Sequence, residues 1–296
     1  MPWVTRGLSD GIVTTRYPRR PDGYGDGFRG AVRTVDPSGG DAEEAAAVAA
    51  VCPTGAIHVD RAGVRLDRGR CILCGRCVAE RPDRFAFDPS PEVAGLTRAS
   101  LVVGADGPGD ASELAEARAA LARRVRALRR SVHIRHVDAG SDGAAEWEVN
   151  ALVNPVYDVH RLGIFFTASP RHADLLLVTG VGAAGMLGSL SQTFEVMPDP
   201  KVVVAAGVDA ISGGLIGNGY AARGGVVDSL PVDVFVPGSP PTPFGLLHGI
   251  LLAIGLLPKA RHGATRRSMN PRPPVRSEGA AHGPSSPEDP PREDGP

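Results

Sequence analysis

The sequence predicts an α/β protein in two parts: a small cysteine-rich α+β unit, then a larger domain built on a parallel sheet. Two observations lead to this fold class. All four cysteines lie between Cys52 and Cys77, and short apolar runs that end in glycine recur in the second half of the chain. The chain has 296 residues, a length that suits about two domains.

The second half of the chain has the pattern of buried parallel strands. Short apolar runs that end in glycine are typical of strands covered by helices on both faces. Such runs are DLLLVTG (174–180), KVVVAAG (201–207) and VDVFVPG (232–238), and SVHIRHVDAGS (131–141) is expected to be an earlier strand. Functional residues of such sheets lie in the loops after the carboxyl ends of the strands.

Helices are expected before and after these strands. Residues 111–130 are rich in strong helix formers with apolar residues at helical spacing, and residues 240–257 are expected to form a closing helix with Pro243 in its first turn. The segment 104–110 reads as a linker. We therefore expect an extended N-terminal segment over 1–39, a cysteine domain over 40–95, a linker and helix over 96–130, an α/β domain over 131–258 and a disordered tail over 259–296.

Charge and hydropathy exclude some classes of protein. The formal net charge is −1, which does not indicate a nucleic-acid partner. The longest apolar run, Phe244 to Pro258, is too short for a transmembrane helix of about 20 residues. We therefore expect a cytoplasmic protein, and clustered cysteines in a reducing compartment favour a metal site over disulfides.

The cysteine spacing predicts an iron–sulfur site. Cys71-x2-Cys74-x2-Cys77 places three thiols on one tight loop, and Cys52, followed by Pro53, supplies the fourth. The residues between Cys52 and Cys71 are expected to form a turn and a short hairpin. The sequence thus predicts one [4Fe–4S] cluster. A four-cysteine zinc site is the alternative, although zinc ribbons usually pair two C-x2-C knuckles.

A second cluster, as in two-cluster ferredoxins, would need four more cysteines. The positions that would supply them hold Ala42, Ala45, Val48 and Arg81, the last still followed by Pro82. We therefore interpret the cysteine unit as half of a two-cluster ferredoxin, with the other half filled by side chains.

Longer motifs carry a resemblance to a known family. GIVTTRYPRRP…GFRG, followed by CPTGAI…LDRGRCILCGRC, resembles the ferredoxin-like subunit of formate hydrogenlyase-type (group 4) [NiFe] hydrogenases. HVDAGSDGAAEWEVNAL, NPVYDVHRLGI, SPRHADLLLVTG, MPDPKVVVAAG and PVDVFVPGSPP resemble the small subunit of the same complexes, which is related to the NADH-quinone oxidoreductase B-subunit family. The resemblance runs from Gly11 to Pro258 and implies a ferredoxin-like domain fused to a flavodoxin-like domain.

The chain departs from this family where the second domain should bind a cluster. The family's cysteines there come from a G-S-C-x-x-C loop, a Gly-x-Cys loop and a Pro-Gly-Cys-Pro turn. The matching positions hold Asp142, Ala145, Asp209 and Ser239, although the flanking glycines and prolines remain. The thiolates that would hold iron are absent from these positions. Asp142, Asp209 and Ser239 are expected to be solvated or hydrogen-bonded, the alternative being oxygen ligation of iron.

The resemblance implies a non-catalytic, electron-transfer subunit of a complex I-like or group 4 hydrogenase-like oxidoreductase. It implies as partners a protein like the hydrogenase large subunit or the complex I 49 kDa subunit, and membrane subunits. The protein would then be peripheral on the inner face of the cell membrane. A structural, assembly or redox-sensing subunit of a repurposed complex is the alternative, because the second-domain cluster is expected to be missing.

Two other features of the second domain have competing interpretations. TGVGAAG (179–185) resembles a nucleotide-binding loop but lacks the other residues of such motifs, so a tight strand-to-helix turn is favoured. Glu146 and Glu148 flank Trp147 beside the altered loop. A role for Glu146 in proton transfer or at an interface remains open.

Overall fold

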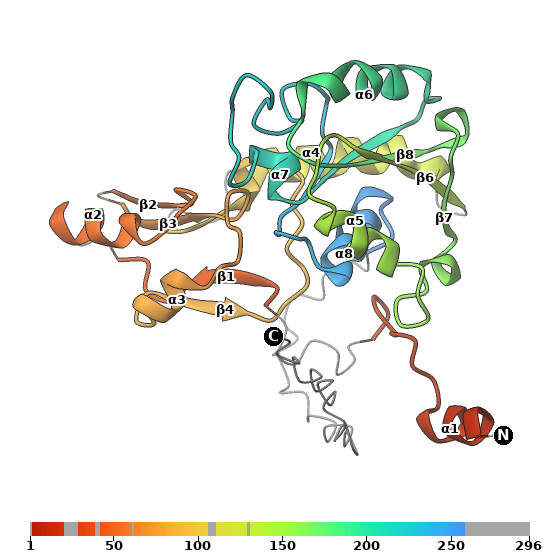
Figure 1. The fold of residues 1–296 in the computed structure, drawn as a ribbon, viewed down its shortest axis with the longest axis horizontal. Helices are drawn as coiled ribbons and strands as arrows, with labels where there is room; N and C mark the ends of the chain where they lie inside the picture. The colour runs from red at the N-terminus through yellow and green to blue at the C-terminus, as the bar shows by residue number, and fades with distance from the viewer. Residues whose placement is uncertain are drawn as a thin grey trace, which may run out of the picture.

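The computed structural model describes residues 2–20, 29–38, 42–60, 62–105, 111–128 and 131–257. A small unit that contains the cysteines lies beside a larger α/β domain, and helix α1 (Pro2–Asp10) stands apart from both (Figure 1). The tail expected to be disordered over 259–296, and most of the expected linker over 104–110, lie outside the described residues.

The α/β domain is built on five parallel strands in the order β10-β9-β8-β6-β7. The strands are β6 (Val132–Asp138), β7 (Ile164–Phe166), β8 (Leu175–Thr179), β9 (Val202–Ala206) and β10 (Val234–Val236). This is the doubly wound, flavodoxin-like order, whose direction of winding reverses between β6 and β8. The four predicted strands and the flavodoxin-like fold class are confirmed; the edge strand β7 was not predicted.

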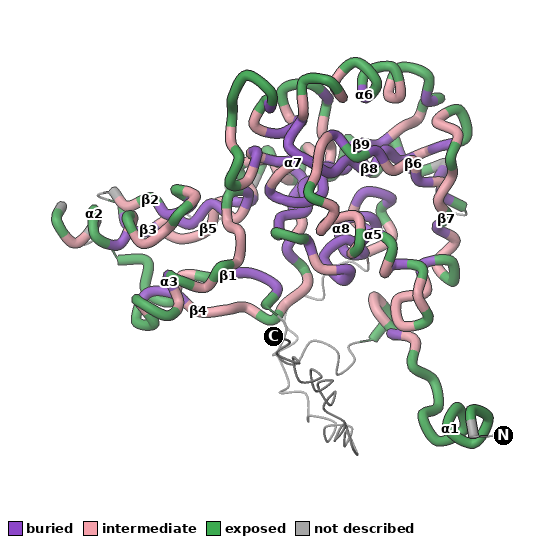
Figure 2. The backbone as a smooth tube through the Cα atoms, viewed as in Figure 1, coloured by how far each residue is buried: buried purple, intermediate pink, exposed green. Residues whose placement is uncertain are grey.

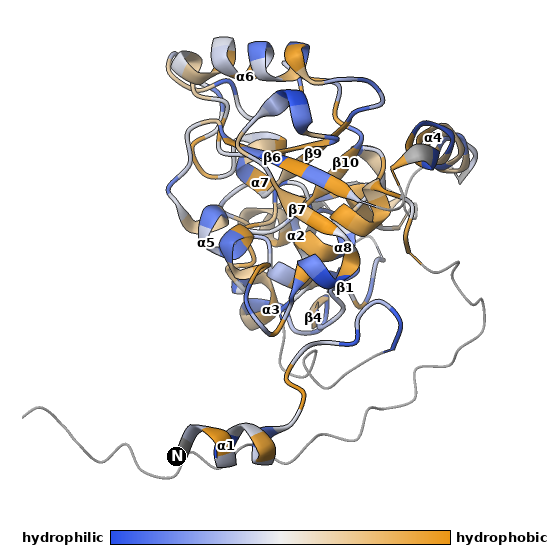
Figure 3. Cartoon of the chain, turned by 90° about the vertical axis from the view of Figure 1, so that its right-hand side faces the viewer, coloured by the Kyte–Doolittle hydropathy of each residue, from blue (hydrophilic) through white to orange (hydrophobic). Residues whose placement is uncertain are grey.

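Helices cover both faces of this sheet. Alternate residues of β8 belong to two separate cores: Leu175 and Leu177 pack on one side, Leu176 and Val178 on the other. The first side is covered by α4 (Ala111–Arg124), α5 (Ala144–Ala151) and α8 (Pro243–Ala253), and the second by α6 (Ala184–Val196) and α7 (Val208–Ser212). The strands and α8 therefore form the buried centre of the domain (Figure 2), where apolar residues gather (Figure 3).

The closing helix α8 begins as the sequence predicts and ends earlier. Thr242 caps it by accepting a hydrogen bond from the Gly245 amide at 3.1 Å, and Pro243 occupies the first turn. The helix ends at Ala253, since Gly255 has a φ of 69° and leaves the helical region. The predicted helix over 111–130 is likewise α4 followed by a single 3-10 turn, Val125–Ala127.

The cysteine unit has two small antiparallel sheets. One pairs β1 (Ala31–Thr34) with β4 (Phe85–Asp88); the other holds β2 (Ile57–Asp60), β3 (Gly63–Asp67) and β5 (Val102–Gly104). β2 and β3 are the predicted hairpin. The helices are α2 (Ala42–Ala50) and α3 (Arg76–Glu80). Further 3-10 turns are Ala99–Leu101, Val159–Leu162 and Pro170–His172.

The N-terminal segment differs from the extended chain that its prolines and glycines indicated. Residues 2–10 form α1, in which Val4 and Leu8 share one face and Pro2 stands where a helix tolerates proline. Residues 31–34 form β1 and pair with β4, which ties them to the cysteine unit. Proline and glycine counts average over a long window, so they missed these two short elements.

Direct contacts join the cysteine unit to the α/β domain. Gly95 exchanges two backbone hydrogen bonds with Phe235 at the edge strand β10. Ser212, the last residue of α7, donates its hydroxyl to the Gly69 carbonyl at 2.8 Å. The Ala94 amide donates to His248 Nδ1 in α8 at 3.3 Å. The loop before Cys71 thus packs directly against the strand-end loops of the larger domain.

Candidate functional sites

All four cysteines line one pocket, here called the cysteine pocket. Cys52 follows α2, Cys71 and Cys74 lie in the loop between β3 and α3, and Cys77 lies in α3. Cys77 is buried, Cys74 is exposed and the other two are half-buried. The tertiary structure therefore brings together the four residues that the spacing singled out.

Backbone amides point at the sulfur atoms of this pocket. The Ala56 amide donates to Cys52 Sγ at 3.2 Å, and backbone groups of Leu73 and Val78 hydrogen-bond the thiols of Cys71 and Cys77. Amide hydrogen bonds to cysteine sulfur are one of the means by which proteins tune iron–sulfur clusters. The surroundings of the thiols thus fit the group that the spacing predicts.

The cysteine pocket favours protonated thiols over thiolates unless a positively charged metal group is bound. Burial, and then the negative charge of the neighbouring cysteines, raise the pKa of Cys71 to about 11. Burial also raises the pKa of Cys77. Metal ligation requires deprotonated cysteine, so a bound cationic cluster would supply the charge that stabilises these thiolates.

The arrangement of the four thiols is compatible with two kinds of metal site. Within the described residues, no three histidine, cysteine or acidic side chains are close enough together to hold one metal ion. The four thiols nevertheless surround a common pocket. Four thiols around one pocket could supply the ligands of a four-iron cluster, whose irons take one cysteine each, or of a tetrahedral zinc ion.

The half of the unit where a second cluster would lie is occupied by charged and apolar side chains. Arg81 pairs with Glu44 of α2 at 3.2 Å and with Asp83 at 3.0 Å, and Arg84 binds the same Glu44 carboxylate at 2.6 Å. Val48 of α2 is buried in the core of the unit. Positions 42 and 45 belong to α2. The region is thus held by an ion-pair network and a helix.

A second pocket, of about 80 Å³, lies at the carboxyl ends of the parallel strands. Its lining includes Asp142, Ala145, Asp209 and Ser239, which come from the loops and helix starts after β6, β9 and β10. These are the four positions at which the family resemblance expects cysteines. The backbone still gathers them around one cavity, although none carries a thiol.

A hydrogen-bonded chain supports the wall of the second pocket. Glu146 accepts from the hydroxyl of Ser141 at 2.7 Å and from the hydroxyl of Thr179. His136 Nε2 lies 3.0 Å from Thr179 Oγ1. Because the Thr179 proton is directed to Glu146, His136 Nε2 must carry the hydrogen of its bond to Thr179. Sequence reasoning singled out Glu146 but missed Thr179 and His136, which only the pairing of β6 with β8 brings near it.

The titration behaviour of the second pocket follows from burial. Burial raises the pKa of Asp209, and the negative charges of Asp142 and Glu146 raise it further. Burial lowers the pKa of His136, although the nearby Glu146 and Asp138 oppose that shift. The pocket is therefore an acidic, partly buried site with no soft ligand.

The glycine-rich loop after β8 serves close backbone packing. Gly180 has a φ of 87°, and a Cβ atom there would lie 2.7 Å from the Gly140 backbone. A Cβ on Gly182 would lie 2.2 Å from the Gly225 carbonyl oxygen. These glycines allow the loops around the second pocket to pack against one another, as expected from the turn interpretation.

The fold and the sites define a class: a chain that joins a ferredoxin-like unit of the 4Fe–4S type to a flavodoxin-like domain. Two family models support it. Residues 143–253 match the NADH ubiquinone oxidoreductase, 20 Kd subunit family, and residues 64–124 match a 4Fe-4S single cluster domain. The chain belongs to the family of the 20 kDa (B) subunits of NADH-quinone oxidoreductase, with an added 4Fe–4S ferredoxin-like domain.

Curated relatives include hydrogenase and complex I subunits. Formate hydrogenlyase subunit 7 of Escherichia coli is 36% identical over 49% of this chain and 57% of its own length. The probable membrane-bound hydrogenase subunit mbhJ of Pyrococcus furiosus is 40% identical over 45% of this chain and 80% of its own. The NADH-quinone oxidoreductase B-subunit of Citrifermentans bemidjiense is 45% identical over 32% and 55%. The chain thus spans little more than half of two of these relatives.

A solved archaeal complex also resembles part of the chain. A subunit of the membrane-bound sulfane sulfur reductase, described as an archaeal respiratory membrane complex, is 33% identical over 45% of this chain and 73% of its own, with a TM-score of 0.40. In the described ranges of the present structure, every helix is too short or too polar to cross a bilayer.

Proposed function

We propose that this chain is an electron-transfer subunit that carries a single [4Fe–4S] cluster on Cys52, Cys71, Cys74 and Cys77. The observation that carries the proposal is the contrast between two pockets. The four thiols of the chain line the cysteine pocket, while the second pocket presents carboxylate, hydroxyl and methyl groups. When bound, the cluster would accept and release one electron; the chain binds it, buries it and directs amides to its sulfur ligands.

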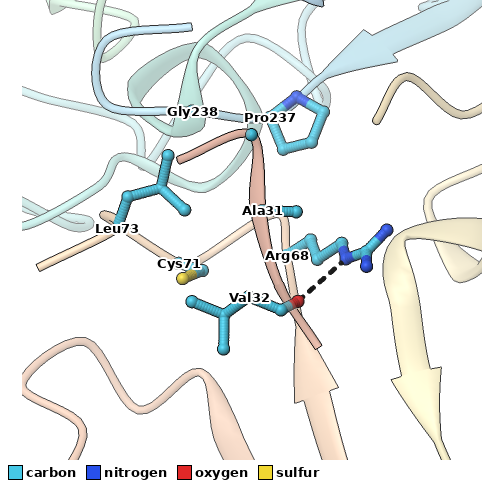
Figure 4. Close-up of a pocket in the computed structure, with 8 residues that line it drawn as sticks. Ala31, Val32, Arg68, Cys71, Leu73, Pro237 and Gly238 are labelled. Carbon is cyan, nitrogen blue, oxygen red and sulfur yellow. Dashed lines mark hydrogen bonds between the residues drawn. The ribbon is translucent and has the colours of Figure 1, made fainter. Parts of the chain in front are cut away.

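A third pocket shares lining residues with both the cysteine pocket and the second pocket. This junction pocket is lined by Cys71 and Leu73 on one side and by Pro237 and Gly238 on the other (Figure 4). Gly238 also lines the second pocket. The corner of the cluster at Cys71 would therefore face the α/β domain, and the exposed Cys74 would face solvent or a redox partner.

The partner proposed for the second domain is a protein like the hydrogenase large subunit or the complex I 49 kDa subunit, within a complex that includes membrane subunits. The exposed apolar residues Trp147, Leu215, Ile216 and Tyr220 support this docking. Trp147 lies in α5, which follows β6, and the Ala183–Ala222 bridge holds the 213–223 loop beside the turn after β8. All four therefore lie near the carboxyl edge of the sheet. Through its membrane subunits, such a complex would hold the protein at the inner face of the membrane.

A structural or redox-sensing role is the second candidate, and the second pocket favours it. Without thiols at that pocket, electrons that reach the cysteine unit lack the next cluster that the family resemblance implies. A partner that has itself lost its metal ligands would support this alternative. A partner with intact nickel ligands would support electron transfer.

The test of the cluster is anaerobic purification with iron, sulfide and zinc analysis and EPR of the reduced protein. We expect about four irons per chain and one S = 1/2 signal. The Cys74→Ser variant should lose or alter that signal, and Ser191→Ala on α6, a matched surface change, should not. About eight irons would contradict the single cluster, and stoichiometric zinc without iron would contradict the iron–sulfur assignment.

The docking surface has its own test. Trp147→Asp and Tyr220→Asp should each reduce co-purification of a co-expressed large-subunit-like partner. Trp3→Asp is the matched control, because Trp3 of α1 is 74% exposed, close to the 77% of Trp147, and lies far from the carboxyl edge of the sheet (Figure 1). An equal loss with all three variants would contradict the proposed surface.

A further inference from the structure

The loop before Cys71 holds two arginines in different surroundings. Arg68 is half-buried and lines the junction pocket beside Cys71 and Gly238. Arg70, two residues further on, is 52% exposed. The two side chains carry the same charge on the same loop, so their difference in burial is a natural comparison.

Arg68 joins the cysteine loop to strand β1. Its Nε donates to the Val32 carbonyl oxygen at 3.2 Å. Figure 4 shows Arg68 Nε directed at that oxygen, with Cys71 and Leu73 on the opposite side of the pocket and the end of the guanidinium pointing away from them. Val32 is buried and belongs to the same core as Cys77. The hydrogen bond therefore fixes Arg68 Nε at β1, in the wall of the pocket that Cys71 also lines.

The charge of Arg68 acts on Cys71 through a poorly screened region. Burial lowers the pKa of Arg68, while the negative charges of Asp88 and Cys71 raise it. An arginine keeps its proton in proteins, so this side chain is a permanent positive charge. Charges inside a protein interact more strongly than charges in water, since the local dielectric constant is lower.

The charge of Arg70 is weakened in comparison. Its side chain is about half exposed to water, and it pairs with Asp67 at a distance of 3.8 Å between Nε and Oδ2. Water and salt screen exposed charges. Arg70 should therefore influence the cluster much less than Arg68 does, although it is nearer to Cys71 in the sequence.

We propose that Arg68 is the positioning and tuning residue of the cysteine pocket: it ties β1 to the ligand loop and raises the reduction potential of a cluster bound at Cys71. The inference rests on the proposed function. Reduction adds one negative charge to the cluster, and a nearby buried cation stabilises the reduced form relative to the oxidised form. Asp88 is the counter-charge that moderates this effect.

The experiment is a potentiometric EPR titration of the anaerobically reconstituted full chain. Arg68→Met should lower the equilibrium constant for reduction about fivefold, which is about 40 mV for a one-electron couple. Arg68→Lys, which keeps the charge, should stay within about twofold of the native chain. Arg70→Met is the matched control and should also change the constant less than about twofold.

The experiment distinguishes failure of the Arg68 role from failure of the proposed function. A native chain that binds no iron contradicts the proposed function itself. Full iron content with an unchanged potential in Arg68→Met, or an equal shift in Arg70→Met or Arg68→Lys, would overturn the role of Arg68. If Arg68→Met cannot retain a cluster, Asp88→Asn provides the test: it should raise the reduction constant, and an unchanged value would overturn the proposal.

Discussion

The cysteine pocket and the second pocket differ in chemistry more than in architecture. Each lies where loops from several elements converge, and the junction pocket shares Cys71 with the first and Gly238 with the second. The first retains thiols with amides directed at sulfur, whereas the second holds Asp142, Asp209 and Ser239. The backbone thus gathers the four positions at which the family resemblance implies cysteines around one cavity, although none of them carries a thiol.

The physical reason is that shape and ligation depend on different residues. Around the second pocket, the glycines at 140, 180 and 207 have positive φ values, and they allow close packing whether or not a metal is bound. The ligand positions lie at the ends of strands, where a side chain can change without disturbing the sheet. The packing around the second pocket therefore does not depend on thiols at these positions.

The largest expected effect comes from introducing cysteines at the four positions of the second pocket. The variant Asp142→Cys/Ala145→Cys/Asp209→Cys/Ser239→Cys should raise the iron content from about four to about eight per chain after anaerobic reconstitution, since soft thiolates hold iron–sulfur clusters. The matched control Asp142→Ser/Ala145→Ser/Asp209→Ser should add no iron. An unchanged iron content in the four-cysteine variant would show that the pocket has lost more than its ligands.

The anchoring of the cysteine loop should have the next largest effect. Arg98 forms two hydrogen bonds with the buried Asp67 carboxylate, at 2.7 and 2.5 Å. Arg98→Met would leave that carboxylate without its main partner and should lower the free energy of unfolding by about 3 kcal/mol in urea denaturation. Arg76→Met, which removes an exposed pair with Glu80, should cost less than about 1 kcal/mol. Equal costs would contradict the anchoring role.

The contact between the two units at His248 should make stability depend on pH. Burial lowers the pKa of His248 to about 4, below its usual value of about 6.5. The unfolded chain therefore binds a proton at a higher pH than the folded chain does. The stability contribution is complete above pH 6.5 and is lost as the pH falls toward 4.

This dependence can be isolated by substitution. Between pH 7.5 and pH 5, the native chain should lose about 2 kcal/mol of unfolding free energy through His248. His248→Leu should be less stable at pH 7.5, since the Ala94 amide loses its acceptor, but should show a smaller loss on acidification. The measurement is urea unfolding at both pH values, and an identical loss in the variant would refute the assignment.

The hydrogen-bonded wall of the second pocket should give the smallest effect. Thr179 is fully buried, and its hydroxyl links His136 to Glu146. Thr179→Val keeps the shape and removes both bonds, so it should cost about 1–2 kcal/mol in thermal or urea unfolding. Thr193→Val on α6, which removes a solvent-exposed hydrogen bond from the Thr193 hydroxyl to the Ser189 carbonyl oxygen, should cost less than about 0.5 kcal/mol. No difference between the two would mean that the network does not stabilise the pocket.

Much of the fold was readable from local patterns. The apolar runs ending in glycine predicted β6, β8, β9 and β10, because a strand buried on both faces needs apolar residues throughout its length. The edge strand β7, Ile164–Phe166, escaped prediction because only three residues pair and one of them, Phe165, is 39% exposed. Helix α1 escaped it for a similar reason: a short helix leaves little signal among prolines and glycines.

The sequence predicted the cysteine positions of the candidate site but not the ion pairs around it. Cysteine spacing singled out the four thiols because ligands of one cluster recur at characteristic separations, and the structure places them around one pocket. The four cysteine ligands and the number of clusters per chain stay predictions, which the measurement of iron content tests. The ion pairs of Arg81 with Glu44 and of Arg98 with Asp67 could not be predicted, since each joins residues more than 30 positions apart.

The residue types and their order were sufficient to indicate the fold class, the thiol set and the substituted positions of the second pocket, since these depend on periodicity and on the chemistry of single side chains. The arrangement of the junction was not accessible in this way. The Ser212 hydroxyl contacts Gly69 and Gly238 borders two pockets because the two units pack together, and Arg68 reaches Val32 because the cysteine unit folds two distant segments side by side. Long-range packing depends on the summed fit of whole surfaces, which no local pattern records.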